Sequence, residues 1–172
     1  MIGNISNSFI SNNIILDHIC CSEGLDVSNN IFFKYGTLNL SGGNSIYKNN
    51  IFLSDDPINT GNNVFQNNVN CDPAQNQNNQ NYNNVNETFD EIFVTPGIAP
   101  YTYNVHNDYH VKTTSQCHNS GTDGTERGIY GGAFPWIDGS IPSNPHIYHK
   151  NVAGSTNANG QLQVHFKVRT SN

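Results

Sequence analysis

The sequence predicts an all-β fold made of short stacked coils, a β-solenoid, and three observations lead to it. The tripeptide Asn-Asn-Ile/Val recurs along the chain, at residues 12–14, 29–31, 49–51 and 67–69. The copies are 17, 20 and 18 residues apart, a period too short for a helical hairpin but suited to one coil of a solenoid. Between the copies, short runs of Ile, Phe, Val and Leu alternate with Gly, Ser, Asn and Asp, as strands alternate with turns.

The repeat around the third copy shows the layout that we expect for one coil. Its three expected strands are residues 37–40, 45–47 and 51–53. Ser41-Gly42-Gly43-Asn44 separates the first two strands as a turn. Asn49 and Asn50 form a tight corner before the third strand, because asparagine adopts the left-handed conformation more readily than other non-glycine residues.

The preceding repeat has the same layout. Its expected strands are residues 19–21, 25–27 and 31–33. Ile19 and Cys21 are expected to point inward and Cys20 outward, because side chains alternate along a strand. Three strands per coil, with asparagine stacked on asparagine at one corner, are typical of a right-handed parallel β-helix. We expect the paired asparagines to be structural, with their side-chain amides hydrogen-bonded along the stack.

The composition narrows the classes of function. Asparagine fills 31 of 172 positions, charged residues make up only 12% and the net charge is −6. With only seven Lys and Arg, a nucleic-acid-binding surface is not expected. No apolar run approaches the roughly 18 residues of a membrane-spanning helix.

The composition also resembles that of extracellular or cell-surface proteins, yet residues 1–4 lack the basic start of a signal peptide. We therefore expect a piece of a longer chain, whose first coil is covered by missing sequence or by another subunit. Cys20 and Cys21 are adjacent and face opposite sides of one strand. A bridge between Cys71 and Cys117 is one alternative, and buried or free thiols are the favoured interpretation.

Two segments depart from the repeat. From residue 75 to residue 86, ten of twelve positions are Asn or Gln, which predicts an Asn/Gln-rich loop over residues 72–90 that interrupts the coils of residues 1–132. Residues 133–172 are expected to form a capping segment and a short antiparallel β tail. The apolar positions that alternate along this tail are Leu162, Val164, Phe166 and Val168.

Residues 107–132 carry a more specific pattern, NDYHVKTTSQCHNSGTDGTERGIYGG. This run resembles the final coil of the right-handed parallel β-helix repeat family, within the pectate-lyase-like superfamily, and especially secreted proteins of Bacteroidota-type bacteria. The resemblance covers roughly residues 1–148, with departures at Gln116, His118 and Glu126-Arg127. It implies the fold but no activity, because such coils carry lyases, hydrolases, epimerases and adhesins alike.

The turns that close successive coils would place six polar residues along one edge, beside the first strand. These candidate binding residues are Asp17, His18, Lys34, Tyr35, Asp55 and Asp56. Lyases of this fold bind Ca²⁺ through acidic residues near that edge, and many glycosidases use paired carboxylates. The alternative that we favour is simple turn chemistry. We therefore expect no catalytic residue, no metal site and no cofactor, with Ca²⁺ as the one ion that these carboxylates would accept.

These observations favour a non-catalytic secreted or cell-surface scaffold that is adhesive or contacts a polysaccharide. Two alternatives stay open. One is a polysaccharide lyase or glycoside hydrolase whose main catalytic residues lie upstream. The other is a structural subunit that assembles through open solenoid ends.

Overall fold

The computed structural model describes residues 2–3, 5–20, 22–33, 43–53, 57–58, 61–73, 78–138 and 145–169. The chain divides into two compact units, Met1–Trp136 (unit 1) and Ile137–Asn172 (unit 2). The division falls four residues after the predicted end of the coils at residue 132. No helix of the described residues is long and apolar enough to cross a membrane.

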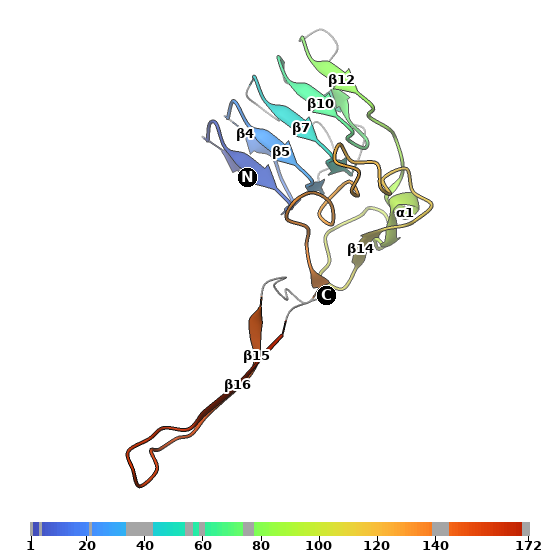
Figure 1. The fold of residues 1–172 in the computed structure, drawn as a ribbon. Helices are drawn as coiled ribbons and strands as arrows, with labels where there is room; N and C mark the ends of the chain where they lie inside the picture. Colours follow the sequence, from blue (N-terminus) through green and yellow to red (C-terminus); the bar gives the residue numbers. More distant parts are fainter. Residues whose placement is uncertain are drawn as a thin grey trace. The chain divides into compact units, whose positions relative to one another are not determined.

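The regular structure of unit 1 consists of short strands, most of them in parallel sheets, and one short helix, which confirms the all-β prediction (Figure 1). The largest sheet has five strands in the order β12-β10-β7-β5-β2. Its strands are β2 (Phe9–Ser11), β5 (Asp26–Ser28), β7 (Ile46–Lys48), β10 (Val64–Gln66) and β12 (Gln80–Tyr82). Each strand comes from the next repeat of the sequence, so equivalent residues of successive repeats lie side by side.

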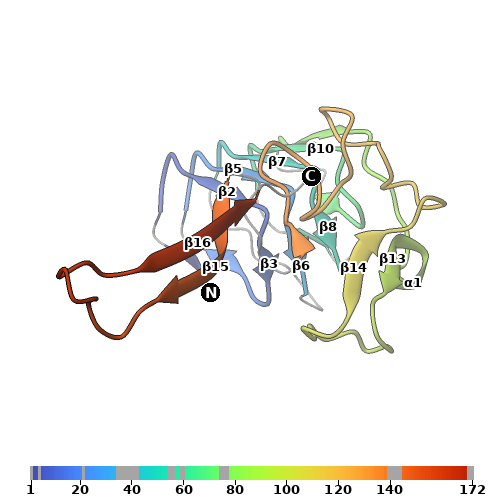
Figure 2. The same cartoon turned by 60° about the horizontal axis from the view of Figure 1, so that its bottom comes forward.

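The other parallel sheets pair successive repeats in the same way (Figure 2). One contains β3 (Ile14–Ile15), β6 (Ile31–Phe32) and β8 (Ile51–Phe52). Two further pairs are β1 (Ile2–Gly3) with β4 (Ile19–Cys20), and β9 (Pro57–Ile58) with β11 (Asp72–Pro73). The strands expected in 19–21, 25–27, 31–33, 45–47 and 51–53 each appear to within a residue. The strand expected at 37–40 lies outside the described residues.

The apolar core follows from the alternation of side chains along these strands. The central residues of four strands of the five-stranded sheet point inward and are buried, namely Ile10, Val27, Tyr47 and Phe65. Like residues stack on like, with ring centroids 4.9 Å apart for Tyr47 and Phe65 and 4.7 Å apart for Phe32 and Phe52. Ile19 is fully buried, as predicted, whereas the side chains of Cys20 and Cys21 lie outside the description.

The second asparagine of each pair forms a buried ladder along the stack. Its members are Asn13, Asn30, Asn50, Asn68 and Asn84. Each side-chain carbonyl accepts two hydrogen bonds from the asparagine of the preceding repeat, one from the backbone N–H and one from the side-chain amide, at 2.8–3.2 Å. Asn30, Asn50 and Asn68 are fully buried. The ladder satisfies backbone donors that would otherwise be buried without a partner.

The first asparagine of each pair turns the chain. Asn12, Asn29, Asn49, Asn67 and Asn83 have φ of 52–56°, in the left-handed region that asparagine tolerates. The predicted structural role of the asparagine pairs is therefore confirmed for both members.

The Asn/Gln-rich segment differs from the predicted loop. Within residues 72–90, β11 pairs with β9, β12 pairs with β10 in register, Asn84 extends the ladder and Val85 bridges to Val69. The tripeptide Asn83-Asn84-Val85 repeats the motif again and supplies the next asparagine of the ladder. The corner needs only an asparagine pair and one apolar residue, so a polar composition elsewhere in the segment does not prevent it from continuing the sheet.

The segment after β12 closes a second core cluster. Thr88 is the N-cap of α1 (Phe89–Ile92), and its N–H and hydroxyl both donate to the Glu91 carboxylate. These two hydrogen bonds hold the pKa of Glu91 below its usual range. β13 (Phe93–Thr95) then pairs antiparallel with β14 (Asp108–Val111). Aromatic rings of this region pack edge to face, among them Phe33, Phe89, Phe93 and Tyr109.

Residues 120–131, here called the corner strip, do not form the final coil that the resemblance implied. The strip runs along the stack and pairs with the left-handed asparagines. Their side-chain amides donate to Ser120 O from Asn67, to Thr122 Oγ1 from Asn49, to Glu126 O and Gly128 O from Asn29, and to Ile129 O and Gly131 O from Asn12. Later residues of the strip bond to asparagines of earlier repeats. The strip therefore runs antiparallel to the direction in which the repeats stack.

Unit 2 is a two-stranded antiparallel hairpin of β15 (His146–Val152) and β16 (Val164–Arg169). This element matches the predicted antiparallel tail.

Replacing a central ladder residue should destabilise unit 1 far more than replacing a terminal one. Asn50→Ala removes the acceptor of the buried Asn30 N–H, and it removes the side-chain amide that donates to Val27 O and to Asn68 Oδ1. We therefore expect a loss of roughly 3 kcal/mol in the free energy of unfolding. Asn13→Ala removes only donors at the end of the ladder and should cost about 1 kcal/mol. Denaturant unfolding measures both, and equal small losses would contradict the ladder.

A second prediction concerns two glycines of the corner strip that have similar φ angles. Gly124 and Gly128 have φ of 78° and 84°, so an added Cβ carries a similar left-handed cost of roughly 1 kcal/mol at each. A Cβ on Gly124 meets open space, whereas one on Gly128 would lie 2.8 Å from Cδ1 of the fully buried Ile51. Gly128→Ala should therefore lower unfolding stability by about 1–3 kcal/mol more than Gly124→Ala. Thermal or denaturant unfolding that shows no difference would argue against strip packing.

Candidate binding surface on the five-stranded sheet

The sequence-predicted edge is described only in part. Asp17 and His18 follow β3, and Asp17 Oδ1 lies 3.4 Å from His18 Nε2. The other four candidates, Lys34, Tyr35, Asp55 and Asp56, lie outside the described residues. Because Asp17 and His18 are consecutive in the sequence, their contact does not test the predicted edge, and the grouping of the six residues stays a prediction.

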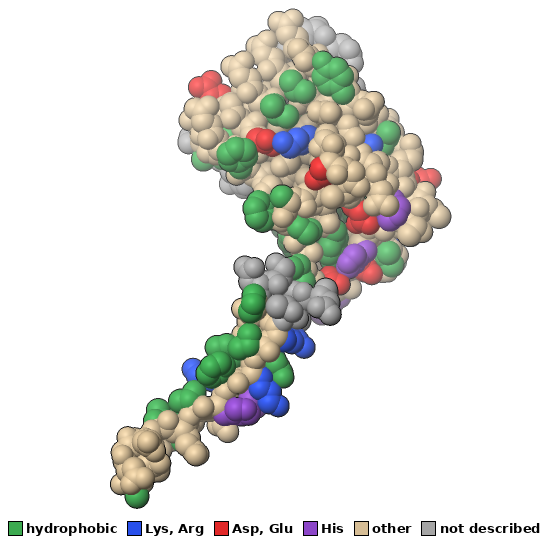
Figure 3. All heavy atoms as spheres, in the orientation of Figure 1, with side chains coloured by type: hydrophobic (Ala, Val, Ile, Leu, Met, Phe, Trp, Pro, Cys, Tyr) green, Lys and Arg blue, Asp and Glu red, His purple; other side chains and the backbone are tan. Residues whose placement is uncertain are grey.

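The outward face of the five-stranded sheet is the better-defined surface. The residues on either side of each inward-pointing position face outward and form two columns across the strands. One column is Phe9, Asp26, Ile46, Val64 and Gln80, and the other is Ser11, Ser28, Lys48, Gln66 and Tyr82. We call these ten residues the outer sheet face. Figure 3 shows a side of unit 1 on which an acidic and a basic side chain adjoin among polar and scattered hydrophobic groups.

One ion pair lies near the middle of this face. Lys48 Nζ is 2.8 Å from Asp26 Oδ2, across the β5–β7 pairing, and both side chains are part-exposed. An ion pair of this exposure contributes at most about 1 kcal/mol to stability. The other carboxylate oxygen, Asp26 Oδ1, is buried and has no hydrogen-bond partner among the described residues. Of this pair, the part-exposed ammonium group of Lys48 is the group that a ligand could reach.

Two aromatic rings mark the ends of the same face. Phe9 on β2 is 84% exposed and Tyr82 on β12 is 50% exposed, with Ile46 between them at 42%. Strands of a sheet are about 4.8 Å apart, so the four spacings from β2 to β12 separate the two strands that carry the rings by roughly 19 Å. An exposed aromatic ring presents a flat apolar face on which a ligand can stack. The face thus presents rings at both ends and hydroxyl, amide and charged groups between them.

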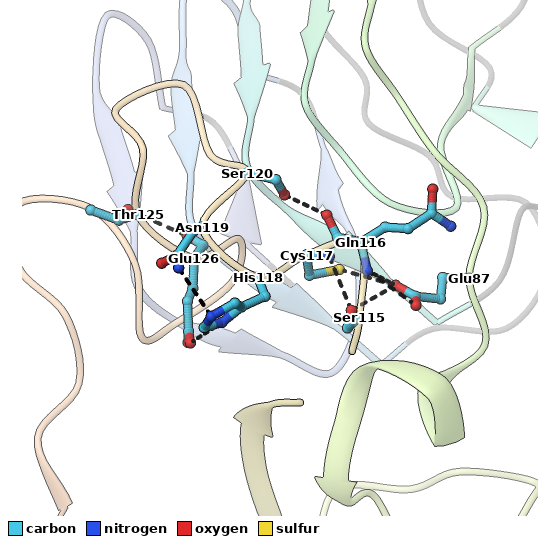
Figure 4. Close-up of polar contacts among 9 residues, drawn as sticks. All are labelled: Glu87, Ser115, Gln116, Cys117, His118, Asn119, Ser120, Thr125 and Glu126. Carbon is cyan, nitrogen blue, oxygen red and sulfur yellow. Dashed lines mark hydrogen bonds and ion pairs between the residues drawn. The ribbon is translucent and has the colours of Figure 1, made fainter. Parts of the chain in front are cut away.

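A second constellation holds the start of the corner strip and involves a cysteine (Figure 4). The Glu87 carboxylate accepts hydrogen bonds from Ser115 Oγ at 2.7 Å and from the backbone N–H of Gln116 at 3.1 Å. Cys117 Sγ lies 3.6 Å from Glu87 Oε2. Cys117 is fully buried, and burial raises the pKa of its thiol to about 12. The thiol is therefore protonated at neutral pH and is a poor nucleophile.

The histidine beside this cysteine is held by the strip. His118 Nδ1 lies 3.2 Å from Glu126 Oε1, and His118 Nε2 lies 3.0 Å from the Asn119 amide nitrogen. Both ring nitrogens are thus engaged with neighbours. Arg127 is buried and donates from Nη1 to Asn68 O and from Nε to Ser120 Oγ. This constellation fastens the strip to the stack, and its polar groups are already occupied by one another.

Cys71 and Cys117 are both buried and form no disulfide with each other, which confirms the favoured interpretation of the sequence, and the alternative of a bridge between them is wrong.

A hollow of about 410 Å³ beside α1 is the other candidate site in unit 1. Glu87, Glu91 and Tyr101 contribute to its lining. Both carboxylates accept hydrogen bonds from the protein itself, and the Tyr101 hydroxyl donates to Asp90 Oδ2. This hollow offers a ligand fewer uncommitted polar groups than the outer sheet face does.

The sequence predicted a candidate binding site on the turns that close the coils, and it did not predict the outer sheet face. Part of the signal was present in the strand alternation, since Asp26 lies beside Val27 in the predicted strand 25–27, whereas Lys48 directly follows the predicted strand 45–47. Asp26 and Lys48 are neighbours only in the register by which β5 pairs with β7. This register cannot be read from the sequence, because the repeats differ in length.

Comparison of the chain with protein-family models, with curated proteins and with solved structures found no match.

The burial of Cys117 predicts its reactivity. Native protein treated with iodoacetamide at pH 8 should leave Cys117 unmodified over hours, because a buried thiol with a pKa of about 12 presents almost no thiolate. Unfolding in denaturant should expose it and restore the rate of a free cysteine. Peptide mass spectrometry locates the label, and rapid labelling of Cys117 in the native protein would contradict this placement.

Proposed function

We propose that this chain is a non-catalytic scaffold that contacts a glycan through the outer sheet face. The observation that carries the proposal is the pair of in-register columns across five parallel strands, one with Phe9 and Asp26 and the other with Lys48 and Tyr82. A flat array of this kind suits an extended, repeating ligand rather than a small molecule, which is usually enclosed in a cleft.

The proposed fold is a right-handed parallel β-helix with three strands per coil. Three strand pairings support it, because Ile2 pairs with Ile19, Phe9 with Asp26 and Ile14 with Ile31. All three are offset by 17 residues, as expected if residues 2–18 make one turn of a coil that carries three strands. A solenoid presents the same face from every coil, which is how such folds build long binding surfaces.

The chemistry of the face supports a carbohydrate. Aromatic rings stack on the apolar C–H faces of sugar rings, and amide, hydroxyl and charged groups hydrogen-bond sugar hydroxyls. A separation of roughly 19 Å between the strands that carry Phe9 and Tyr82 would engage an oligosaccharide at two points, so that each ring strengthens the binding of the other. In keeping with the composition, we place this contact at a cell surface or outside the cell.

Binding without turnover is favoured by the distribution of carboxylates. Asp26 is the one acidic side chain among the ten residues of the outer sheet face, and it is ion-paired with Lys48. Hydrolysis of a glycosidic bond by the usual route needs two carboxyl groups that flank the bond. The face therefore offers polar recognition and stacking, and its single paired carboxylate is suited to accepting hydrogen bonds.

A panel of neutral and acidic polysaccharides tests the proposal by binding and by product release. We expect binding of at least one polysaccharide without release of products, and about tenfold weaker binding in each of Phe9→Ala and Tyr82→Ala. Phe134→Ala is the matched control, because Phe134 is 80% exposed in unit 1 but lies outside this face, and it should bind as the unaltered protein does.

Three outcomes would contradict the proposal. The first is the absence of binding to every polysaccharide of the panel, and the second is equal weakening by Phe134→Ala. The third is turnover of a bound polysaccharide, which would favour the lyase or hydrolase alternative.

A further inference from the structure

The hairpin of unit 2 has two faces of opposite character. Its register pairs Ile147 with Val168, Lys150 with Phe166 and Val152 with Val164 on one face. On the other face His146 pairs with Arg169, His149 with Lys167 and Asn151 with His165. Figure 3 shows hydrophobic side chains gathered along one side of the hairpin, and Lys, Arg and His along the other. The first face is apolar apart from Lys150, and the second is basic.

The apolar face is exposed. Ile147, Val164, Phe166 and Val168 are 49–58% exposed, and every described residue of 145–169 except the half-buried His146 is exposed. A hairpin of two strands is marginally stable in water unless its apolar face packs against something else. The hairpin thus has the composition of an element that binds through this face.

The charge of the hairpin is opposite to that of the rest of the chain. Residues 145–169 contain no Asp or Glu, and they contain Lys150, Lys167 and Arg169. Unit 1 holds four Lys and Arg against twelve Asp and Glu, a net charge of −8, whereas unit 2 holds three against one, a net charge of +2. Cations concentrated on one small element indicate an anionic partner.

We propose that this hairpin docks onto the surface of an anionic lipid bilayer. Its apolar face enters the boundary between headgroups and acyl chains, and Lys167 and Arg169 remain near the lipid phosphates. Lys150, across from Phe166, extends its ammonium group from the apolar face to the headgroup level, as long cationic side chains do at interfaces. Such two-sided elements, apolar on one face and cationic on the other, bind membranes without spanning them.

Two other partners account for less of the surface. A second copy of the hairpin, packed face to face, would bury only about five apolar side chains from each copy, against the roughly 20–30 residues per side of a stable interface. It would also leave the basic face without a role. A soluble polyanion would use the basic face and leave the apolar face in water. An anionic bilayer uses both faces together.

Co-sedimentation of the full chain with vesicles tests the proposal. Vesicles of phosphatidylcholine mixed with phosphatidylglycerol should bind the protein, and vesicles of phosphatidylcholine alone should bind it far more weakly. The double variant Lys167→Gln with Arg169→Gln should weaken binding to the mixed vesicles about 30-fold, because each cation near an anionic surface contributes about a fivefold effect. Phe166→Ser should weaken it about tenfold. Phe134→Ser, an exposed aromatic of unit 1, is the matched control and should leave binding unchanged.

Three results would overturn the proposal. Equal binding to neutral and mixed vesicles would remove the role of the cations. The protein could bind soluble dextran sulfate as tightly as it binds mixed vesicles, with no effect of Phe166→Ser. That result would show that the basic face binds a polyanion. Dimerisation abolished by Phe166→Ser, without vesicle binding, would assign the apolar face to a second copy.

Discussion

The asparagine ladder at one buried corner is the interaction on which the rest of unit 1 depends. A chain that turns sharply inside a stack must bury backbone N–H groups that no neighbouring strand can accept. Here the side-chain carbonyl of each ladder asparagine accepts that N–H from the preceding repeat, from Asn13 to Asn30 and on to Asn84. The same carbonyl accepts the neighbouring side-chain amide, so successive repeats are locked in register while their lengths vary from 16 to 20 residues.

At four of the five corners, the asparagine before the ladder residue links the corner to the second half of the unit. Its left-handed backbone makes the turn, and its side chain is thereby directed to the corner strip rather than into the core. The dipeptide Asn-Asn therefore builds both the inner ladder and the attachment of a segment far along the chain. Arg127, buried against Asn68 O, fixes the strip at one further point.

The repeat could be predicted from the sequence because its signal is local, with an asparagine pair and an apolar residue at each corner. The copy Asn83-Asn84-Val85, which continues the ladder, lies in a segment whose composition indicated a loop. The course of the corner strip has no such signal, because its partners are single asparagines between 53 and 119 residues away. The outer sheet face was missed for a related reason, since the meeting of Asp26 and Lys48 depends on register between repeats of different lengths.

Amide hydrogen exchange of the ladder asparagines tests this account most directly. The backbone N–H groups of Asn30, Asn50 and Asn68 donate to side chains, not to strand carbonyls, and the account predicts that they exchange only on global unfolding of unit 1, as slowly as the amides of the central strands. Exchange of these three amides at the rate of exposed turns, while the strand amides remain protected, would show that the corner is open and would contradict the ladder as the source of register.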